Sequence, residues 1–242
     1  MAKSKKSSSQ RTQTYSFPQP APSSKARQIF ALPPIFIWCL ICFKFENFWQ
    51  YSSISSELPS VEALSKIVIS KYTAEEVYEN VYEWAKEYDE ELKEMLEDKE
   101  YSLKVLGIER GNVKPRKDIA KWSDVKYTIS YMYDEKFDKN GEFEYQKVTD
   151  KDEIEKIVKL YFEKYYDEND DKQTWFDKMK DLAEELGYAR EVKEYKANPE
   201  AYKGHVGDIS TVIRVKLTGR CNTPDLYEIM KILGKERILN RI

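Results

Sequence analysis

Positively charged side chains are concentrated in two short stretches of the chain, and both could hold phosphate groups. The first stretch surrounds Pro115 and contains Lys114, Arg116 and Lys117. The second stretch spans residues 203–220, where Asp208 is the single acid, and its basic residues are Lys203, His205, Arg214, Lys216 and Arg220. Because the whole chain has 40 Lys and Arg against 43 Asp and Glu, such local clusters of positive charge are informative.

Histidine and cysteine are too scarce to build a familiar active site. His205 is the one histidine, which excludes a zinc site with several histidine ligands and leaves any Ser-His-Asp site dependent on it. It lies between Gly204 and Gly207, so we interpret it as a polar loop residue. Cys39 and Cys42 form a Cys-x-x-Cys pair in an apolar run without a second pair or a histidine nearby. The sequence therefore predicts neither catalytic nor metal-binding residues.

The charge is divided unevenly along the 242 residues. Residues 1–60 have seven Lys and Arg against two acids, a balance of +5, and the remaining 182 have 33 against 41, a balance of −8. A uniformly basic nucleic-acid binder is therefore excluded, although a local basic face is not. Three cysteines are too few and too oddly placed for a disulfide scaffold, which indicates a reducing compartment.

The first 60 residues differ in character from the rest. Residues 1–28 are rich in Ser, Lys and Pro, and we expect a disordered extension there. Residues 29–43 are apolar but number only 15 and include two prolines, too few for a membrane-spanning helix. We expect a cytoplasmic protein, with organellar targeting by residues 1–45 as an alternative. A further alternative is that residues 1–60 are not a natural partner of the rest.

Apolar residues recur at three- and four-residue steps after residue 60, which is typical of packed helices. Thr73 and Glu76 form a capping box, and the apolar stripe that follows, residues 77–95, predicts one long helix. The polar residues 134–150 predict a connection between two helical units. We therefore expect an all-α body divided into residues 61–140, a linker with a first helical unit, and residues 141–242, a second helical domain.

Capping residues predict where the last helices begin and end. Asp208 is expected to cap a helix that ends before Gly219. Thr223 and Pro224 then predict the N-cap and first position of the last helix pair, which Gly234 interrupts.

Six segments, in this order, closely resemble the C-terminal part of glutamyl-tRNA synthetases, in particular a bacterial clostridial-type branch. The resemblance runs from about residue 64 to residue 242 and does not include residues 1–60. The segments are 114–125 (KPRKDIAKWSDV), 131–135 (YMYDE), 175–188 (WFDKMKDLAEELGY), 198–208 (NPEAYKGHVGD), 214–219 (RVKLTG) and 223–230 (TPDLYEIM).

The resemblance implies a helical bundle of the class I synthetase anticodon-binding type, which would bind tRNA-Glu, with tRNA-Gln as an alternative. In that family a separate Rossmann-type domain uses ATP and Mg²⁺ to join glutamate to tRNA. Its His-x-Gly-His and Lys-Leu-Ser-Lys-Arg-type elements have no counterpart in this sequence. We therefore expect no cofactor in this chain and no aminoacylation by it alone. The catalytic half would come from another chain or from sequence upstream.

The same resemblance makes the basic residues of both stretches candidates for RNA binding. Lys203 and Arg220, expected in loops, are the better phosphate contacts. Arg214 and Lys216 would point about 160° apart on a helix, and a structural role for Arg214, paired with a buried acid, is the alternative. Proteins read unstacked bases partly by stacking. Trp122 and Tyr202, beside basic residues, are the stacking candidates, whereas four other aromatic residues are expected in the core: Trp84, Tyr161, Trp175 and Phe176.

An alternative from another class is a helical protein–protein or membrane-associated module. It would bind partner helices or membranes through residues 29–49. Deleting residues 1–60 separates the two: tRNA binding should survive the deletion, whereas partner or membrane association should be lost.

Overall fold

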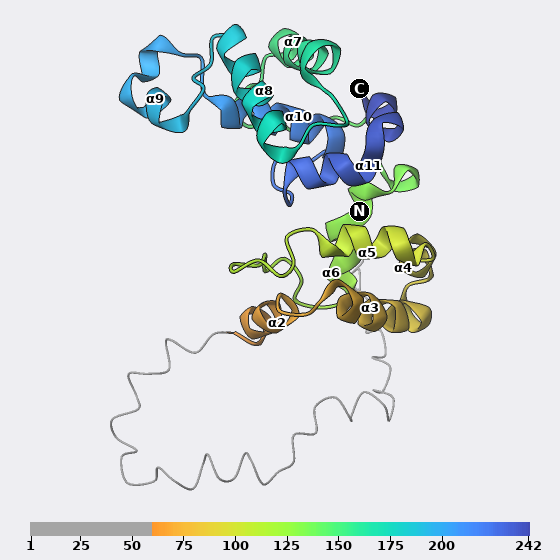
Figure 1. Ribbon diagram of the computed structural model, residues 1–242. Coiled ribbons are helices and arrows are strands. Elements are labelled where there is room, and N and C mark those ends of the chain that lie inside the picture. Colours follow the sequence, from red (N-terminus) through yellow and green to blue (C-terminus); the bar gives the residue numbers. More distant parts are fainter. Residues whose placement is uncertain (1–59) are drawn as a thin grey trace, which may run out of the picture. The chain divides into compact units, whose positions relative to one another are not determined.

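Helices form all the regular structure of residues 60–242, the part of the chain that the computed structural model describes (Figure 1). An isolated bridge between Ala189 and His205 is the only extended pairing within this range. The predicted all-α body is therefore confirmed. The predictions for the N-terminal extension, including the apolar run and the Cys39–Cys42 pair, lie outside the described residues.

Ten α-helices and four shorter helical turns follow one another along residues 60–242. The α-helices are α2 (Val61–Ile69), α3 (Ala74–Tyr88), α4 (Glu90–Met95), α5 (Lys99–Gly107), α6 (Ser123–Ile129), α7 (Lys151–Leu160), α8 (Lys172–Glu185), α9 (Val192–Ala197), α10 (Val206–Thr218) and α11 (Leu226–Arg241). The turns are η2 (Ser130–Met132), η3 (Asp134–Lys136), the π turn η4 (Tyr161–Tyr165) and η5 (Pro199–Ala201).

The capping box predicted at the start of α3 is present, but the single long helix predicted after it is wrong. Thr73 accepts from the backbone N–H of Glu76, and the Glu76 carboxylate accepts from that of Thr73. Asp89 adopts an extended backbone, φ −151° and ψ 90°, and divides the segment into α3 and α4. Its carboxylate caps α4 by accepting from the N–H of Leu92 at 3.0 Å. A side-chain cap therefore replaces helix continuation.

The last two long helices begin at residues other than those predicted. His205, not Asp208, is the N-cap of α10, and the Asp208 carboxylate closes the box by accepting from the His205 N–H at 2.9 Å. Asp225, not Thr223, caps α11 through the N–H of Glu228. Thr223 and Pro224 instead lie in the loop before α11.

Two glycines end helical segments where the sequence predicted it. Gly219 closes α10 in the left-handed conformation, φ 69°, which favours glycine. Gly234 interrupts α11 with φ 73° and ψ 163°. The Gly219 turn sends the chain back toward α11 through residues 219–225, and this loop is central to the site described below.

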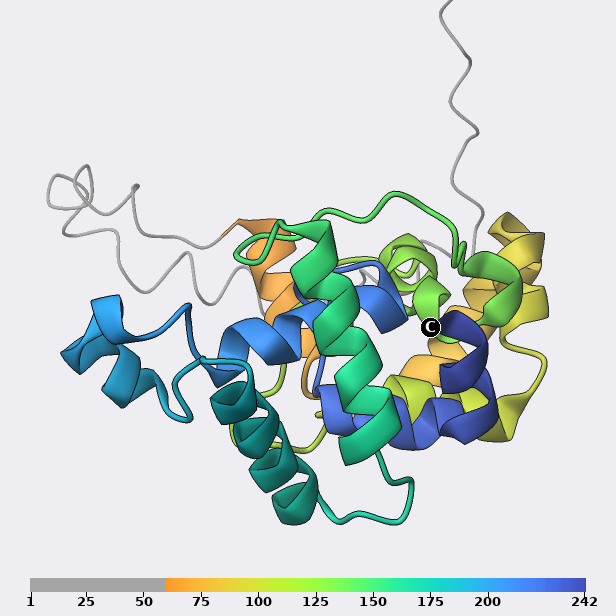
Figure 2. The same cartoon turned by 90° about the horizontal axis from the view of Figure 1, so that it is seen from above.

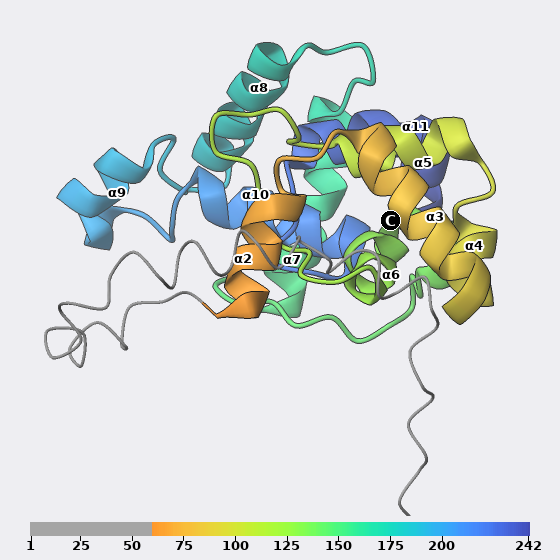
Figure 3. The same ribbon diagram turned by 90° about the horizontal axis from the view of Figure 1, so that it is seen from below.

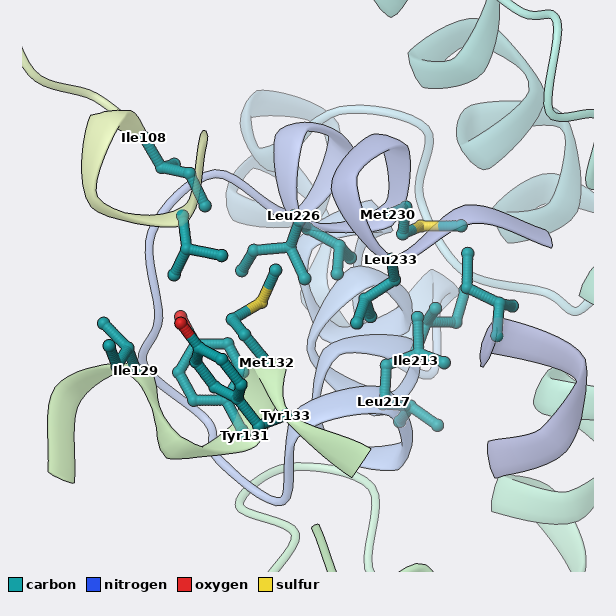
Figure 4. Close-up of a cluster of buried hydrophobic side chains, with 14 of the residues drawn as sticks. Ile108, Ile129, Tyr131, Met132, Tyr133, Ile213, Leu217, Leu226, Met230 and Leu233 are labelled. Carbon is teal, nitrogen blue, oxygen red and sulfur yellow. The ribbon is translucent and has the colours of Figure 1, made fainter. Parts of the chain in front are cut away.

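The core joins residues far apart in the sequence. α3 packs on α4 and α5, α10 packs on α7, α8 and α11, and α11 also contacts α5. Figure 4 shows buried side chains of η2 facing those of α10 and α11, including Met132, Leu217 and Leu226. Arg241 of α11 is 2% exposed and donates to the carbonyls of Tyr131 and Leu217. η2 is therefore fixed against the two last helices.

Residues 60–242 belong to one compact unit. Figure 2 shows residues 137–150 as a connection without helix between η3 and α7. The division into 61–140 and 141–242 stays a prediction. Within residues 60–242, no helix has both the length and the apolar character needed to cross a membrane.

Three of the four aromatic residues expected in the core contribute to it. Tyr161 is fully buried and accepts a hydrogen bond from the Trp175 indole N–H at 2.9 Å. Trp84 and Trp175 are partly buried against the core. The prediction is wrong for Phe176, which is 37% exposed and lies under the Lys180 ammonium on the surface of α8.

Candidate nucleic-acid interface

Two predicted site residues, Arg116 and Arg214, meet at one backbone carbonyl although they are 98 positions apart. Arg116 Nη1 donates to the Thr223 carbonyl oxygen at 3.1 Å, and Arg214 Nη1 donates to the same oxygen at 3.2 Å. Arg214 also donates to the Pro224 carbonyl at 2.6 Å and to the Thr223 hydroxyl. The two guanidinium groups thereby fix the loop of residues 219–225.

The fold explains why Arg214 takes this position. It lies on α10, one turn before the helix ends at Gly219, so the returning loop passes its side chain. Burial lowers the pKa of Arg214 from its usual value, while the nearby Asp225 acts in the opposite direction. The structural role foreseen as an alternative is thus present, but its hydrogen-bond acceptors are loop oxygens rather than a buried acid.

Arg116 has a more exposed set of partners. Its Nε donates to Asp118 at 2.6 Å, and Glu109 lies 3.8 Å away. Its terminal nitrogens also contact the Asn222 side-chain oxygen at 3.4 Å. Because the Asn222 side chain is exposed, one polar edge of the loop stays open to a ligand.

Arg220 is a third arginine at this site and belongs to the loop itself. Its side chain lies on two tyrosine rings. Its guanidinium carbon is 3.9 Å from the centre of the Tyr127 ring and 5.0 Å from that of Tyr131, and Nη2 donates to the Ser130 hydroxyl at 3.1 Å. Burial lowers the pKa of Arg220. Such cation–π contacts stabilise the arrangement and leave the planar guanidinium oriented.

Tyr131 lies among the positive charges of all three arginines. Burial raises the pKa of Tyr131 to about 12, and the charges of Arg220, Arg116 and Arg214 each oppose this rise. We call Arg116, Arg214 and Arg220, together with the loop 219–225, the arginine cluster. Asp118 and Glu109 pair with Arg116, and Asp225 lies near Arg214, so these acids partly balance the positive charge of the cluster.

Tyr127 is a candidate that sequence reasoning missed. It is 72% exposed on α6, directly against Arg220. An exposed aromatic ring beside an oriented guanidinium is a platform on which an unpaired base can stack. Tyr127 lies only four residues after Ser123 at the start of α6, in a segment without basic residues other than Lys126, so no local pattern singled it out.

The remaining predicted residues near Pro115 have different surroundings. Lys114 and Lys117 are exposed, and no ion pair within residues 60–242 includes either. Trp122, a predicted stacking residue, is partly buried against the core and tilts on Tyr72 with ring centres 6.5 Å apart. The lysines are therefore available to phosphates, whereas part of the Trp122 ring is already covered.

Lys203 and His205 make other contacts. Lys203 Nζ pairs with Glu153 of α7 at 2.9 Å and lies over the Tyr188 ring. His205 Nδ1 accepts from the Gly207 N–H at 3.0 Å, and its ring meets Tyr195 edge-on. Tyr202, half-buried, precedes them after η5. We call Lys203, Gly204 and His205 the His205 turn.

Lys216 points to a different surface from Arg214, as the helical spacing predicted. It lines an open groove of about 820 Å³, and the other charged residues of that groove belong mainly to α7 and the connection before it. These are Lys139, Glu142, Lys151, Glu155, Lys159 and Glu163. With four lysines against three glutamates, this groove has mixed charge.

A comparison with protein families finds one match in the C-terminal part of the chain. The family is described as an anticodon binding domain, and the match covers residues 76–242. These residues include every member of the arginine cluster and Tyr127.

Comparison with curated proteins finds relatives named glutamate–tRNA ligase. The one from Clostridium perfringens strain 13 is 46% identical over 77% of this chain and 34% of the relative. The one from Acetivibrio thermocellus is 45% identical over 77% and 34%, and that from Sorangium cellulosum is 38% identical over 77% and 33%. The chain therefore spans about a third of the length of the curated relatives that it matches.

Proposed function

Because the chain belongs to the anticodon-binding domain family found in glutamate–tRNA ligases, we propose that it binds the anticodon arm of transfer RNA. Its preferred ligand is tRNA-Glu, with tRNA-Gln as the alternative. We assign aminoacylation to no residue of this chain, and we propose that the catalytic half acts from a separate polypeptide or from an adjoining part of a longer one.

The observation that carries this proposal is the convergence of Arg116 and Arg214 on the Thr223 carbonyl. Two arginines from distant segments donate to one carbonyl of the loop, and the loop presents the exposed Asn222 beside them. The Asn222 side-chain oxygen already accepts from Arg116, so its amide NH₂ group is the donor that the loop offers to a base edge. A fixed loop with such a side chain suits recognition of an unpaired base.

The surroundings of the loop supply the other interactions that RNA requires. Tyr127 offers an exposed face for stacking, and the Arg220 guanidinium packs against the Tyr127 ring. Lys114 and Lys117 offer charge to phosphates. We propose Trp122, Tyr202, Lys203, His205 and Lys216 as outer contacts only, since four of the five already make contacts within the protein or lie in the mixed-charge groove.

We further propose a cytoplasmic location, since the relatives named above are bacterial proteins. The alternative of organellar targeting concerns residues 1–45, outside residues 60–242. The alternative function as a partner-binding or membrane-associated module also concerns that part of the chain.

Filter binding of the full chain to several RNAs tests the proposal. We expect micromolar or tighter binding to a tRNA-Glu transcript, comparable binding to its isolated anticodon arm, and a steep loss of affinity with rising salt. An unrelated duplex RNA of the same length is the control. Equal affinity for that duplex, or no binding to tRNA-Glu at low salt, would overturn the proposal.

A further inference from the structure

A pocket of about 260 Å³ lies where the loop after η4 meets α8 and α11. Three aromatic residues line it, Tyr166, Trp175 and Tyr227, together with the buried Met230. Each of the three aromatic residues is half-buried, so part of its surface faces solvent. Figures 2 and 3 show the loop between η4 and α8 at the periphery of the helices, where a ligand can reach it. We call this the aromatic pocket.

The size of the aromatic pocket limits the class of ligand. Pockets for drug-sized molecules begin at about 300 Å³, so a smaller molecule or a single chemical group fits here. No residue of the arginine cluster lines the pocket. A ligand in it would therefore be distinct from the RNA proposed above.

Hydrogen bonds fix two of the three rings and occupy their polar atoms. The Trp175 indole N–H donates to the Tyr161 hydroxyl at 2.9 Å, and the Tyr227 hydroxyl donates to the Asp170 carbonyl at 3.0 Å. The rings of Trp175 and Tyr227 have their centres 5.7 Å apart and their planes inclined by 50°. Because both donors are used within the protein, these residues offer a ligand their aromatic carbon surface, whose faces are electron-rich.

Two carboxylates complete the lining of the pocket. Asp167 and Glu168 line it and are exposed. Burial raises the pKa of Tyr166, and the negative charges of Glu168 and Asp167 add to this rise, which places both carboxylates near the phenol. The Asn169 N–H donates to Asp167 at 2.9 Å and lowers the pKa of that carboxyl. The Asp167 carboxylate is therefore ionised at neutral pH.

Lysines near the pocket only partly balance these charges. Lys231 also lines the pocket, but its ammonium donates to the backbone carbonyl of Glu168 at 2.7 Å. Lys178 and Lys235 lower the pKa of Asp167 as well, without lining the pocket. In the part of the chain that the structure describes, neither Asp167 nor Glu168 forms an ion pair. Two carboxylates against one lysine leave the lining with a negative balance.

We propose that the aromatic pocket binds a small organic cation whose quaternary ammonium group lies against the rings of Tyr166, Trp175 and Tyr227. Aromatic faces attract such cations, and the attraction increases when the cation is removed from water. Asp167 and Glu168 add a long-range attraction for positive charge and disfavour phosphate.

NMR titration of the isotopically labelled full chain with choline tests the site. The Trp175 indole resonance, identified by its absence in Trp175→Phe, reports on the pocket. We expect it to shift with a Kd of about 1 mM or tighter, while the Trp122 indole resonance stays in place. The uncharged isostere of choline, with a tert-butyl group in place of the trimethylammonium group, should bind at least about fivefold more weakly.

Two matched pairs of variants test the charge and the ring separately. Glu168→Gln should raise the Kd for choline at least about threefold, whereas Glu200→Gln, at an exposed glutamate of η5, should change it by less than about twofold. Tyr166→Leu should raise the Kd at least about threefold, and Tyr166→Phe, which keeps the ring, should bind as the parent chain does. Cooperative thermal unfolding of each variant shows that it is folded.

Several results would overturn the proposal. One is equal affinity for choline and its uncharged isostere, and another is a Trp175 resonance that stays in place at choline concentrations far above the expected Kd. Equal weakening by Glu168→Gln and Glu200→Gln, or by Tyr166→Leu and Tyr166→Phe, would also contradict it. tRNA-Glu affinity should be the same with and without choline. Competition between the two would place choline at the RNA interface and overturn the assignment to this pocket.

Discussion

The arginine cluster and the His205 turn are both rich in positive charge, yet their side chains are used differently. In the cluster, Arg116 and Arg214 fix a loop whose exposed edge stays free, and Arg220 lies on the exposed Tyr127. In the turn, Lys203 is neutralised by Glu153 and His205 caps α10. Nearness in sequence thus does not make a site. Ion pairs and aromatic contacts occur in both regions, since Arg116 pairs with Asp118 and Lys203 lies over the Tyr188 ring. What distinguishes the cluster is that two of its arginines donate to one backbone carbonyl.

Arg214→Ala should have the largest effect, because it removes the buried group that holds the loop. Hydrogen bonds to charged groups contribute about 1.5–3 kcal/mol each, so we expect the free energy of unfolding to fall by about 2 kcal/mol and tRNA affinity to fall with it. Urea denaturation and filter binding measure both. Lys216→Ala, on the same helix, is the control and should change stability by less than about 0.5 kcal/mol. Equal losses of stability for Arg214→Ala and Lys216→Ala would contradict the role of Arg214 in holding the loop.

Tyr127→Ala and Arg220→Ala should weaken tRNA binding while the chain still folds. Stacking contributes about 1–3 kcal/mol per base, which corresponds to a loss of affinity of at least about fivefold. Tyr127→Phe keeps the ring and should bind as the parent chain does. Lys203→Ala, the counterpart in the His205 turn, should change affinity by less than about twofold. A larger loss of tRNA affinity for Lys203→Ala than for Arg220→Ala would show that the His205 turn contributes more to RNA binding than the arginine cluster does.

His205→Ala should affect folding much more than RNA binding, because the histidine caps α10 and is only an outer contact in the proposed interface. Loss of a helix N-cap costs about 1 kcal/mol, so the melting temperature should fall while tRNA affinity stays within about twofold. His205→Asn, another good N-cap residue, should restore most of the stability. If tRNA affinity fell by more than about twofold in both variants alike, the histidine would be a principal RNA contact.

The smallest effect concerns alkaline pH. Burial raises the pKa of Tyr131 to about 12, above the ordinary value of 10.0, so the neutral phenol stabilises the folded state. This contribution is complete below pH 10 and is lost as the pH rises toward 12. In Tyr131→Phe the free energy of unfolding, measured by urea titration, should therefore fall less steeply between about pH 9.5 and 11 than it does in the parent chain. An unchanged slope would show that Tyr131 does not titrate in this way.

Local patterns predicted the parts of the molecule that depend on neighbours in sequence. The capping box at Thr73, the glycine ends of α10 and α11 and the opposite directions of Arg214 and Lys216 all follow from helical geometry. The break at Asp89 was missed because a capping aspartate within a continuous apolar stripe is compatible with either outcome. Tertiary packing decided between them.

The candidate site was only half predictable for a different reason. Residue type alone identifies basic side chains, so the sequence was sufficient to select Arg116, Arg214 and Arg220 as candidates. Their common target, the Thr223 carbonyl, exists only because Gly219 turns the chain beside the segment that follows Pro115. Tyr127 became a candidate only when the fold placed it against Arg220, more than 90 positions away.

Site-specific photocrosslinking from the loop of the arginine cluster tests the central claim most directly. A photoreactive amino acid replaces the exposed Asn222 in the full chain, and the crosslinked nucleotides of tRNA-Glu are mapped. Attachment to the anticodon loop is the predicted result, with weaker attachment when the same group replaces Lys203. Crosslinks confined to the acceptor stem, or stronger attachment from position 203 than from 222, would contradict it.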